Sequence, residues 1–115
     1  MSIGHATGRM LAAHGGQVIA DSAGAMVLRE ADYPPCYYFP RADVLMSRLA
    51  RTDHATHCPY KGDASYFTLT TDDMTAVNGA WSYEKPYPAA IEVAGMISFY
   101  PNHVSIYPAD PAADT

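Results

Sequence analysis

The sequence predicts a mainly β (α+β) domain of compact antiparallel sheets with two short helices. The chain has 115 residues, enough for one hydrophobic core, and 49% of them are hydrophobic. Its apolar stretches are short, rich in β-branched and aromatic residues, and separated by Gly, Pro and Asp, which is typical of strands joined by turns. No repeat or linker divides the chain, so we expect one domain over residues 1–115, with a core over about residues 9–107 and a mobile tail over residues 108–115.

The first half is expected to open with a hairpin, because Gly15-Gly16 lies between two apolar runs and glycine accepts the positive φ of a two-residue turn. After the next strand, Tyr33-Pro34-Pro35 forces an extended, non-helical passage, and Pro40 favours the first turn of a helix. The elements expected here are strands over residues 10–14, 17–20, 25–29, 37–39 and 47–53, and a short helix over residues 40–46.

The second half contains the clearest hairpin pattern, in which two runs of β-branched and aromatic residues flank the turn at Asp72-Asp73. Pro88 at the start and Gly95 at the end favour a second short helix between them. A final pair of strands is separated by Pro101-Asn102-His103. The elements expected here are strands over residues 65–70, 75–83, 96–100 and 104–107, and a helix over residues 88–94.

Charge and composition exclude several classes of function. Seven Lys and Arg against twelve Asp and Glu give a formal charge of -5, which repels phosphate backbones and anionic lipid headgroups. We therefore expect neither nucleic acid nor a membrane as partner. The first sixteen residues do not resemble a secretion signal, and the longest apolar run, residues 23–28, is too short to cross a bilayer. With two cysteines and no disulfide framework, a cytoplasmic location is expected.

The segment over residues 52–62 concentrates side chains that can do chemistry. It holds two of the five histidines, one of the two cysteines and Lys61. A thiol is a good nucleophile only as thiolate, and His57 and Lys61 beside Cys58 both favour that form. We therefore identify Cys58 as the candidate nucleophile or redox centre, His57 as its base, and Lys61 as support for a developing negative charge or as a partner for an anionic ligand group.

Two other interpretations of this segment remain open. Cys58 can be a small buried apolar residue, with the histidines bonded to backbone and Lys61 in solvent. Alternatively, His54, His57 and Cys58 have donor atoms suited to zinc, but a strand would place His57 on the opposite face from the other two, and a structural site needs a fourth ligand. We expect no bound metal and no cofactor.

Nucleotide chemistry receives no support from the motifs. A Walker loop would need Ser or Thr directly after its lysine, where the chain has Gly62 after Lys61. No Asp-x-Asp pair is present to hold divalent cations in line with phosphates. Asp72-Asp73 is explained more simply by the hairpin turn.

Aromatic residues form the other candidate constellation, because nine Tyr accompany three Phe and one Trp. Such rings can fill the core, with hydroxyls reaching the edge, or they can wall a pocket for a planar or cationic ligand. Asn78 would share a face with Trp81 only if the strand bulged at Gly79. The candidate ligand-binding residues are Tyr38, Tyr60, Trp81, Tyr83, Asn78 and Arg41.

Four stretches of the sequence resemble a known family: residues 37–44, 56–62, 78–83 and the Ala94-Gly95 to Phe99-Tyr100-Pro101 region. Together they are similar to the bacterial "domain of unknown function 427" family, over nearly the whole chain. The resemblance implies a β-tent-like fold, shared with type B methionine sulfoxide reductases and the ligand-binding domain of cereblon. It also implies that Cys36 matters less than Cys58. The paired Cys-x-x-Cys motifs of those relatives are missing here, and the family has carried a nucleotidyltransferase label.

These observations favour a domain that binds a small molecule in a Cys/Lys/aromatic pocket between its sheets, with thiol-dependent catalysis as an extension. The alternatives are an interaction or scaffold module without catalysis, and a nucleotidyltransferase-like enzyme. The expected partner is an unidentified small molecule, and the sequence predicts no oligomeric state.

Overall fold

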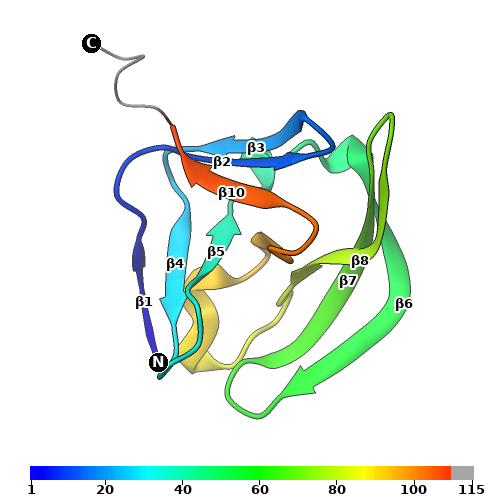
Figure 1. Ribbon diagram of the computed structural model, residues 1–115. Helices are drawn as coiled ribbons and strands as arrows, with labels where there is room; N and C mark the ends of the chain where they lie inside the picture. Colours follow the sequence, from blue (N-terminus) through cyan, green and yellow to red (C-terminus); the bar gives the residue numbers. More distant parts are fainter. Residues whose placement is uncertain (110–115) are drawn as a thin grey trace.

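The computed structural model describes residues 1–109 and contains two antiparallel sheets (Figure 1). The larger sheet has seven strands and the smaller has three. In spatial order, the seven strands are β1 (Ser2–His5), β4 (Met26–Arg29), β5 (Cys36–Phe39), β9 (Ile97–Phe99), β8 (Thr75–Ser82), β7 (Gly62–Thr70) and β6 (Leu49–Cys58). The three are β10 (Ser105–Pro108), β2 (Met10–His14) and β3 (Gln17–Ser22).

The mainly β prediction is confirmed, and so are the two hairpins with local turn signals. β2 and β3 are joined by Gly15 and Gly16, whose φ values of 57° and 81° are both positive, as a tight hairpin turn requires. β7 pairs with β8 over residues that include Leu69 and Ala76. Each of these turns is encoded by the residues that form it.

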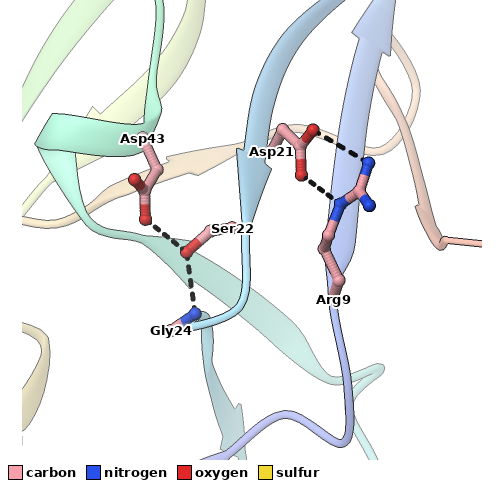
Figure 2. Close-up of polar contacts among 5 residues, drawn as sticks. All are labelled: Arg9, Asp21, Ser22, Gly24 and Asp43. Carbon is pink, nitrogen blue, oxygen red and sulfur yellow. Dashed lines mark hydrogen bonds and ion pairs between the residues drawn. The ribbon is translucent and has the colours of Figure 1, made fainter.

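The small sheet is fastened to the large one beside the short 3-10 helix η1 (Arg41–Asp43). The Ser22 hydroxyl at the end of β3 donates a hydrogen bond of 2.6 Å to Asp43 and accepts one of 2.9 Å from the Gly24 amide (Figure 2). A neighbouring exposed ion pair, Arg9 with Asp21, joins β3 to the residue before β2. The Ser22–Asp43 hydrogen bond therefore joins the hairpin to the segment that follows β5 of the seven-stranded sheet.

The two faces of the large sheet bury different side chains. The face that packs on the three-stranded sheet carries all three phenylalanines, Phe39, Phe67 and Phe99. The opposite face is covered by the 3-10 helix η3 (Pro88–Val93) and carries Tyr38, Tyr66 and Tyr83. Adjacent strand residues point to opposite faces, so the dipeptides Tyr38-Phe39 and Tyr66-Phe67 place one ring on each side.

Neither of the two predicted short helices is an α-helix in the structure. The region over residues 40–46 contains only η1 and the start of η2 (Met46–Arg48), each three residues long. In η3 the backbone of Ala90 is non-helical, with φ -120° and ψ 18°. Segments this short cannot offset the cost of nucleating an α-helix, so they remain 3-10 turns.

Four further features differ from or extend the expected element list. β6 runs to Cys58, so most of the segment over residues 52–62, which holds Cys58, His57 and Lys61, is an edge strand. β1 was not predicted. The final two strands do not pair with each other, because β9 lies in the large sheet and β10 in the small one. The expected tail begins inside β10, which ends at Pro108, and residues 110–115 lie outside the described residues.

Candidate functional site

Lys61 lies in the turn between β6 and β7 and is buried, with only 9% of its surface exposed. Two features hold the turn in place. Gly62 adopts φ 110°, which favours glycine, and the Tyr87 amide donates a hydrogen bond of 2.9 Å to the Lys61 carbonyl. The Lys61 ammonium forms an ion pair with Glu30, which follows β4. The pair therefore connects the β6–β7 end of the sheet to β4, near the other edge.

The charge on Lys61 is maintained by its neighbours. Burial alone would lower the pKa of this ammonium group, but the hydrogen bond with Glu30 and the nearby Cys58 thiol outweigh it, and the net pKa is raised from 10.5. A buried ammonium group without a partner would carry a large desolvation cost. Lys61 is thus a buried, charged residue at neutral pH.

Both cysteines are half-buried against the tyrosine-bearing face. Cys36 begins β5 and Cys58 ends β6, and both thiols lie close enough to Lys61 to interact with its charge. Burial raises the pKa of the Cys36 thiol, an effect that the Lys61 cation only partly opposes. Chemistry was predicted at Cys58 alone, whereas the structure places a second thiol, that of Cys36, near Lys61 as well.

The predicted base, His57, is held away from the thiol. Its Nδ1 lies 2.7 Å from the Asp63 carboxylate, and its side chain is 54% exposed. Asp63 is its cross-strand partner in the β6–β7 pairing. Because neighbouring residues of a strand point to opposite faces, His57 and Cys58 diverge. The other histidine of the segment, His54, packs against the Tyr66 ring at 4.5 Å between centroids.

The aromatic side chains of the second face form a connected layer. The Trp81 indole N–H donates a 3.3 Å hydrogen bond to the Tyr38 hydroxyl, and the two rings meet edge-on. The Trp81 and Tyr100 rings lie 4.5 Å apart between centroids. The Tyr83 and Tyr38 rings lie 6.5 Å apart between centroids. Burial raises the pKa of Tyr38, Tyr83 and Tyr100, so these hydroxyls remain protonated at neutral pH.

A cavity of about 770 Å³ opens beside this layer, where β9 ends and the chain turns toward β10. Its walls come from the β4–β5 loop, from β5 and β8, and from the segment that leads into β10. The lining residues are Glu30, Tyr33, Pro34, Pro35, Cys36, Tyr37, Trp81, Phe99, Tyr100, Pro101, Val104, Ser105, Ile106 and Tyr107. The cavity thus brings together one carboxylate, one thiol and several aromatic rings.

Of the six predicted ligand-binding residues, Trp81 alone lines this cavity. Tyr38 and Tyr83 belong to the aromatic layer but not to the cavity lining, and the other three lie elsewhere. Tyr60 is 70% exposed at the β6–β7 turn. Asn78 occupies a bulge of β8 with φ 53°, where it accepts a 2.6 Å hydrogen bond from Thr52. Arg41 pairs with Glu84 through two hydrogen bonds of 2.9 and 2.5 Å. The hydrogen bonding from Arg41 is the main cause that lowers the pKa of Glu84.

The bulge needed to align Asn78 with Trp81 does occur, but it directs Asn78 toward β6. A Cβ atom at Gly79 would lie 2.7 Å from the Ala76 Cβ, so the bulge requires glycine there. Thr52 belongs to a second bulge, on β6, and its hydrogen bond to Asn78 spans the intervening strand β7. Asn78 therefore has structural partners in β6 and in β7, where the Thr68 hydroxyl accepts a 3.3 Å hydrogen bond from the Asn78 amide.

Sequence reasoning did not select Glu30, Cys36 or Tyr100 for the site. Glu30 and Cys36 flank the rigid Tyr33-Pro34-Pro35 passage, which now forms one cavity wall. The Phe99-Tyr100 dipeptide could have predicted the position of Tyr100, because adjacent aromatic residues of a strand place one ring on each face of the sheet. Among residues 1–109, no group of three His, Cys, Asp or Glu side chains is arranged to hold a metal ion, and no helix is long and apolar enough to span a membrane.

Comparison with known proteins gives one match. The model of a family described as a domain of unknown function (DUF427) matches residues 2–110, which is nearly the entire chain. No curated protein matches.

Proposed function

The chain belongs to the DUF427 family, and we propose that it binds a small, planar, largely apolar molecule in the cavity beside Trp81. The observation that carries this proposal is the cavity itself. Its volume of about 770 Å³ lies within the range of small-molecule sites, and its walls are mainly aromatic and proline residues with a few polar groups. A cytoplasmic location fits a chain whose two cysteines are both free thiols.

The cavity walls are held in place by contacts with neighbouring residues. Trp81 is fixed by the Tyr38 hydroxyl and by the Tyr100 ring, and Tyr38 is itself buried to 1% exposure. On the opposite wall, two consecutive prolines restrict the backbone beside Cys36. Walls that are rigid before binding lose little conformational entropy when a ligand enters. This arrangement favours a ligand-binding role over that of a scaffold module.

Trp81 makes the proposal directly testable, because it is the single tryptophan of the chain. N-Phenyl-1-naphthylamine, a neutral planar fluorophore, accepts energy from indole, so binding in the cavity should quench Trp81 emission saturably. Tyr33→Ala removes an exposed ring from the cavity wall and should weaken binding about fivefold, equivalent to about 1 kcal/mol of lost apolar contact.

Tyr60→Ala is the matched control, since Tyr60 is 70% exposed against 75% for Tyr33 but lies outside the cavity lining. It should leave the binding constant unchanged. Absence of saturable quenching in the unmodified chain, or equal weakening by both substitutions, would refute the proposed site.

A second candidate function, thiol-dependent catalysis, is favoured by the position of Lys61 next to Cys58. The ammonium group would stabilise a thiolate or a developing negative charge, whereas His57 is occupied by Asp63. In a Cys36→Ser chain, which retains Cys58, iodoacetamide alkylation at pH 7 should be slowed several-fold by Lys61→Met and unchanged by Lys85→Met. Equal rates in all three chains would remove the lysine from any such chemistry.

A further inference from the structure

The cavity beside Trp81 has an asymmetric charge distribution. Among residues 1–109, which the structure describes, Glu30 is the one carboxylate in its lining, and no Lys, Arg or His contributes to it. Lys61, which neutralises Glu30 in part, is buried and does not line the cavity, whereas Glu30 does. The ion pair therefore presents its negative end to a ligand.

The aromatic residues of the lining also favour a positively charged ligand. Six rings contribute to the walls: Tyr33, Tyr37, Trp81, Phe99, Tyr100 and Tyr107. The face of an aromatic ring is the negative part of its quadrupole, and indole attracts a cation most strongly. The chain as a whole also carries a formal charge of -5, which raises the local concentration of cations.

We propose that the ligand of this cavity is an organic cation, such as a planar or methylated ammonium compound. This inference rests on the proposed function and specifies its ligand class. Glu30 supplies the charge that attracts the cation, and the rings around Trp81 contact its apolar surface. Phosphorylated ligands are disfavoured, because an anion would meet Glu30 with no cationic side chain in the lining to compensate.

Three probes of similar shape and different charge test this inference. Benzyltrimethylammonium is the cation, 2,2-dimethyl-1-phenylpropane is its neutral counterpart, and phenylmethanesulfonate is an anion. Each is titrated against the complex with N-phenyl-1-naphthylamine. The cation should displace the fluorophore at about tenfold lower concentration than the neutral compound, as expected for a partly desolvated cation–π contact, and the anion should bind weakest. Neutral binding equal to or tighter than cation binding overturns the inference.

Two substitutions of the ion pair separate charge from structural damage. Glu30→Gln and Lys61→Met break the same contact but change the charge beside the cavity in opposite directions. Glu30→Gln should weaken binding of the cation about tenfold, whereas Lys61→Met, by leaving the carboxylate unpaired, should strengthen it. Lys85→Met removes the same charge from an exposed position and should change nothing.

The outcomes distinguish the two proposals. If no probe and no fluorophore binds, the proposed function fails. If the neutral probe binds as well as the cation, or if both ion-pair substitutions weaken all three probes equally, binding stands and the assignment to an organic cation fails. The comparison of probes in the unmodified chain decides the matter even if one of the variants does not fold.

Discussion

The ion pair between Lys61 and Glu30 should contribute measurably to stability, because it joins distant strands of the same sheet. The Lys61 side chain is 11% exposed and that of Glu30 is 29% exposed. Removing one partner of a fully buried pair costs about 3–5 kcal/mol, whereas exposed pairs contribute about 0–1 kcal/mol. Glu30 keeps partial access to water, so Lys61→Met should lower the free energy of unfolding by about 2–3 kcal/mol.

The assay is thermal and urea unfolding of four chains: unmodified, Lys61→Met, Glu30→Gln and the double variant. For a domain of this size the single lysine substitution should lower Tm by about 10–15 °C. The double variant should be less destabilised than the sum of the two single variants, because no unpaired charge remains. Lys85→Met, which removes the only other lysine, serves as the control and should leave Tm nearly unchanged.

The pH dependence gives an independent check on this prediction. The pKa of Lys61 in the folded chain is raised from 10.5, so its stabilising contribution is fully present below pH 10.5 and is lost as the pH rises through the higher folded value. The stability difference between the unmodified chain and Lys61→Met should therefore be the same at pH 6 and pH 9. A coupling energy below about 0.3 kcal/mol in the double-variant cycle, or a difference that has already shrunk by pH 9, would refute the reasoning.

Three further predictions follow from other parts of the structure. Glu84→Gln should lower the free energy of unfolding by about 1–2 kcal/mol at pH 7. This loss should vanish as the pH falls below 4.5, because the Arg41 contact lowers the pKa of the folded carboxyl group. A loss of stability that does not depend on pH would contradict this prediction. Gly79→Ala should destabilise by about 1–3 kcal/mol through the clash with Ala76, whereas Gly4→Ala, with nothing within 4 Å of the new Cβ, should not; urea unfolding compares them. In a chain retaining only Cys36, alkylation should titrate above pH 9.0, because burial raises the thiol pKa; a midpoint below 9.0 would contradict this.

The sequence could predict those elements that are determined by residues close together in the chain. The Gly15-Gly16 turn determines the β2–β3 hairpin through two positive φ values, and the β7–β8 hairpin follows from its strand composition and turn. The separation of β9 from β10 could not be predicted in this way. It depends on backbone contacts such as the hydrogen bond from the Tyr100 amide to the Gly79 carbonyl, which joins residues far apart in the chain.

In the candidate site too, contacts between residues close in the chain could be predicted, and contacts between distant residues could not. Cys58 and Lys61 are three residues apart, and their proximity was visible in the sequence. The partner of Lys61 was not, because any of the twelve acidic residues could have filled that role before the fold was known. His57 was grouped with Cys58 on adjacency alone, and strand alternation together with Asp63 directs it elsewhere.

The excess of tyrosine over phenylalanine has a physical explanation in the two faces of the large sheet. All three phenylalanines lie on the face covered by the small sheet, where a hydroxyl would lack a partner. The other face has a thinner cover, and its hydroxyls bond to one another and to neighbours: Tyr66 lies 2.8 Å from the Thr56 hydroxyl and receives a 3.4 Å hydrogen bond from Tyr100. A layer of rings whose hydroxyl groups are hydrogen-bonded can remain partly open beside a cavity. A purely apolar layer in the same place would expose a continuous hydrophobic surface. The excess of tyrosine therefore follows from a sheet whose two faces are covered by different elements, one by the small sheet and the other by η3 and a layer of tyrosines that bond to one another.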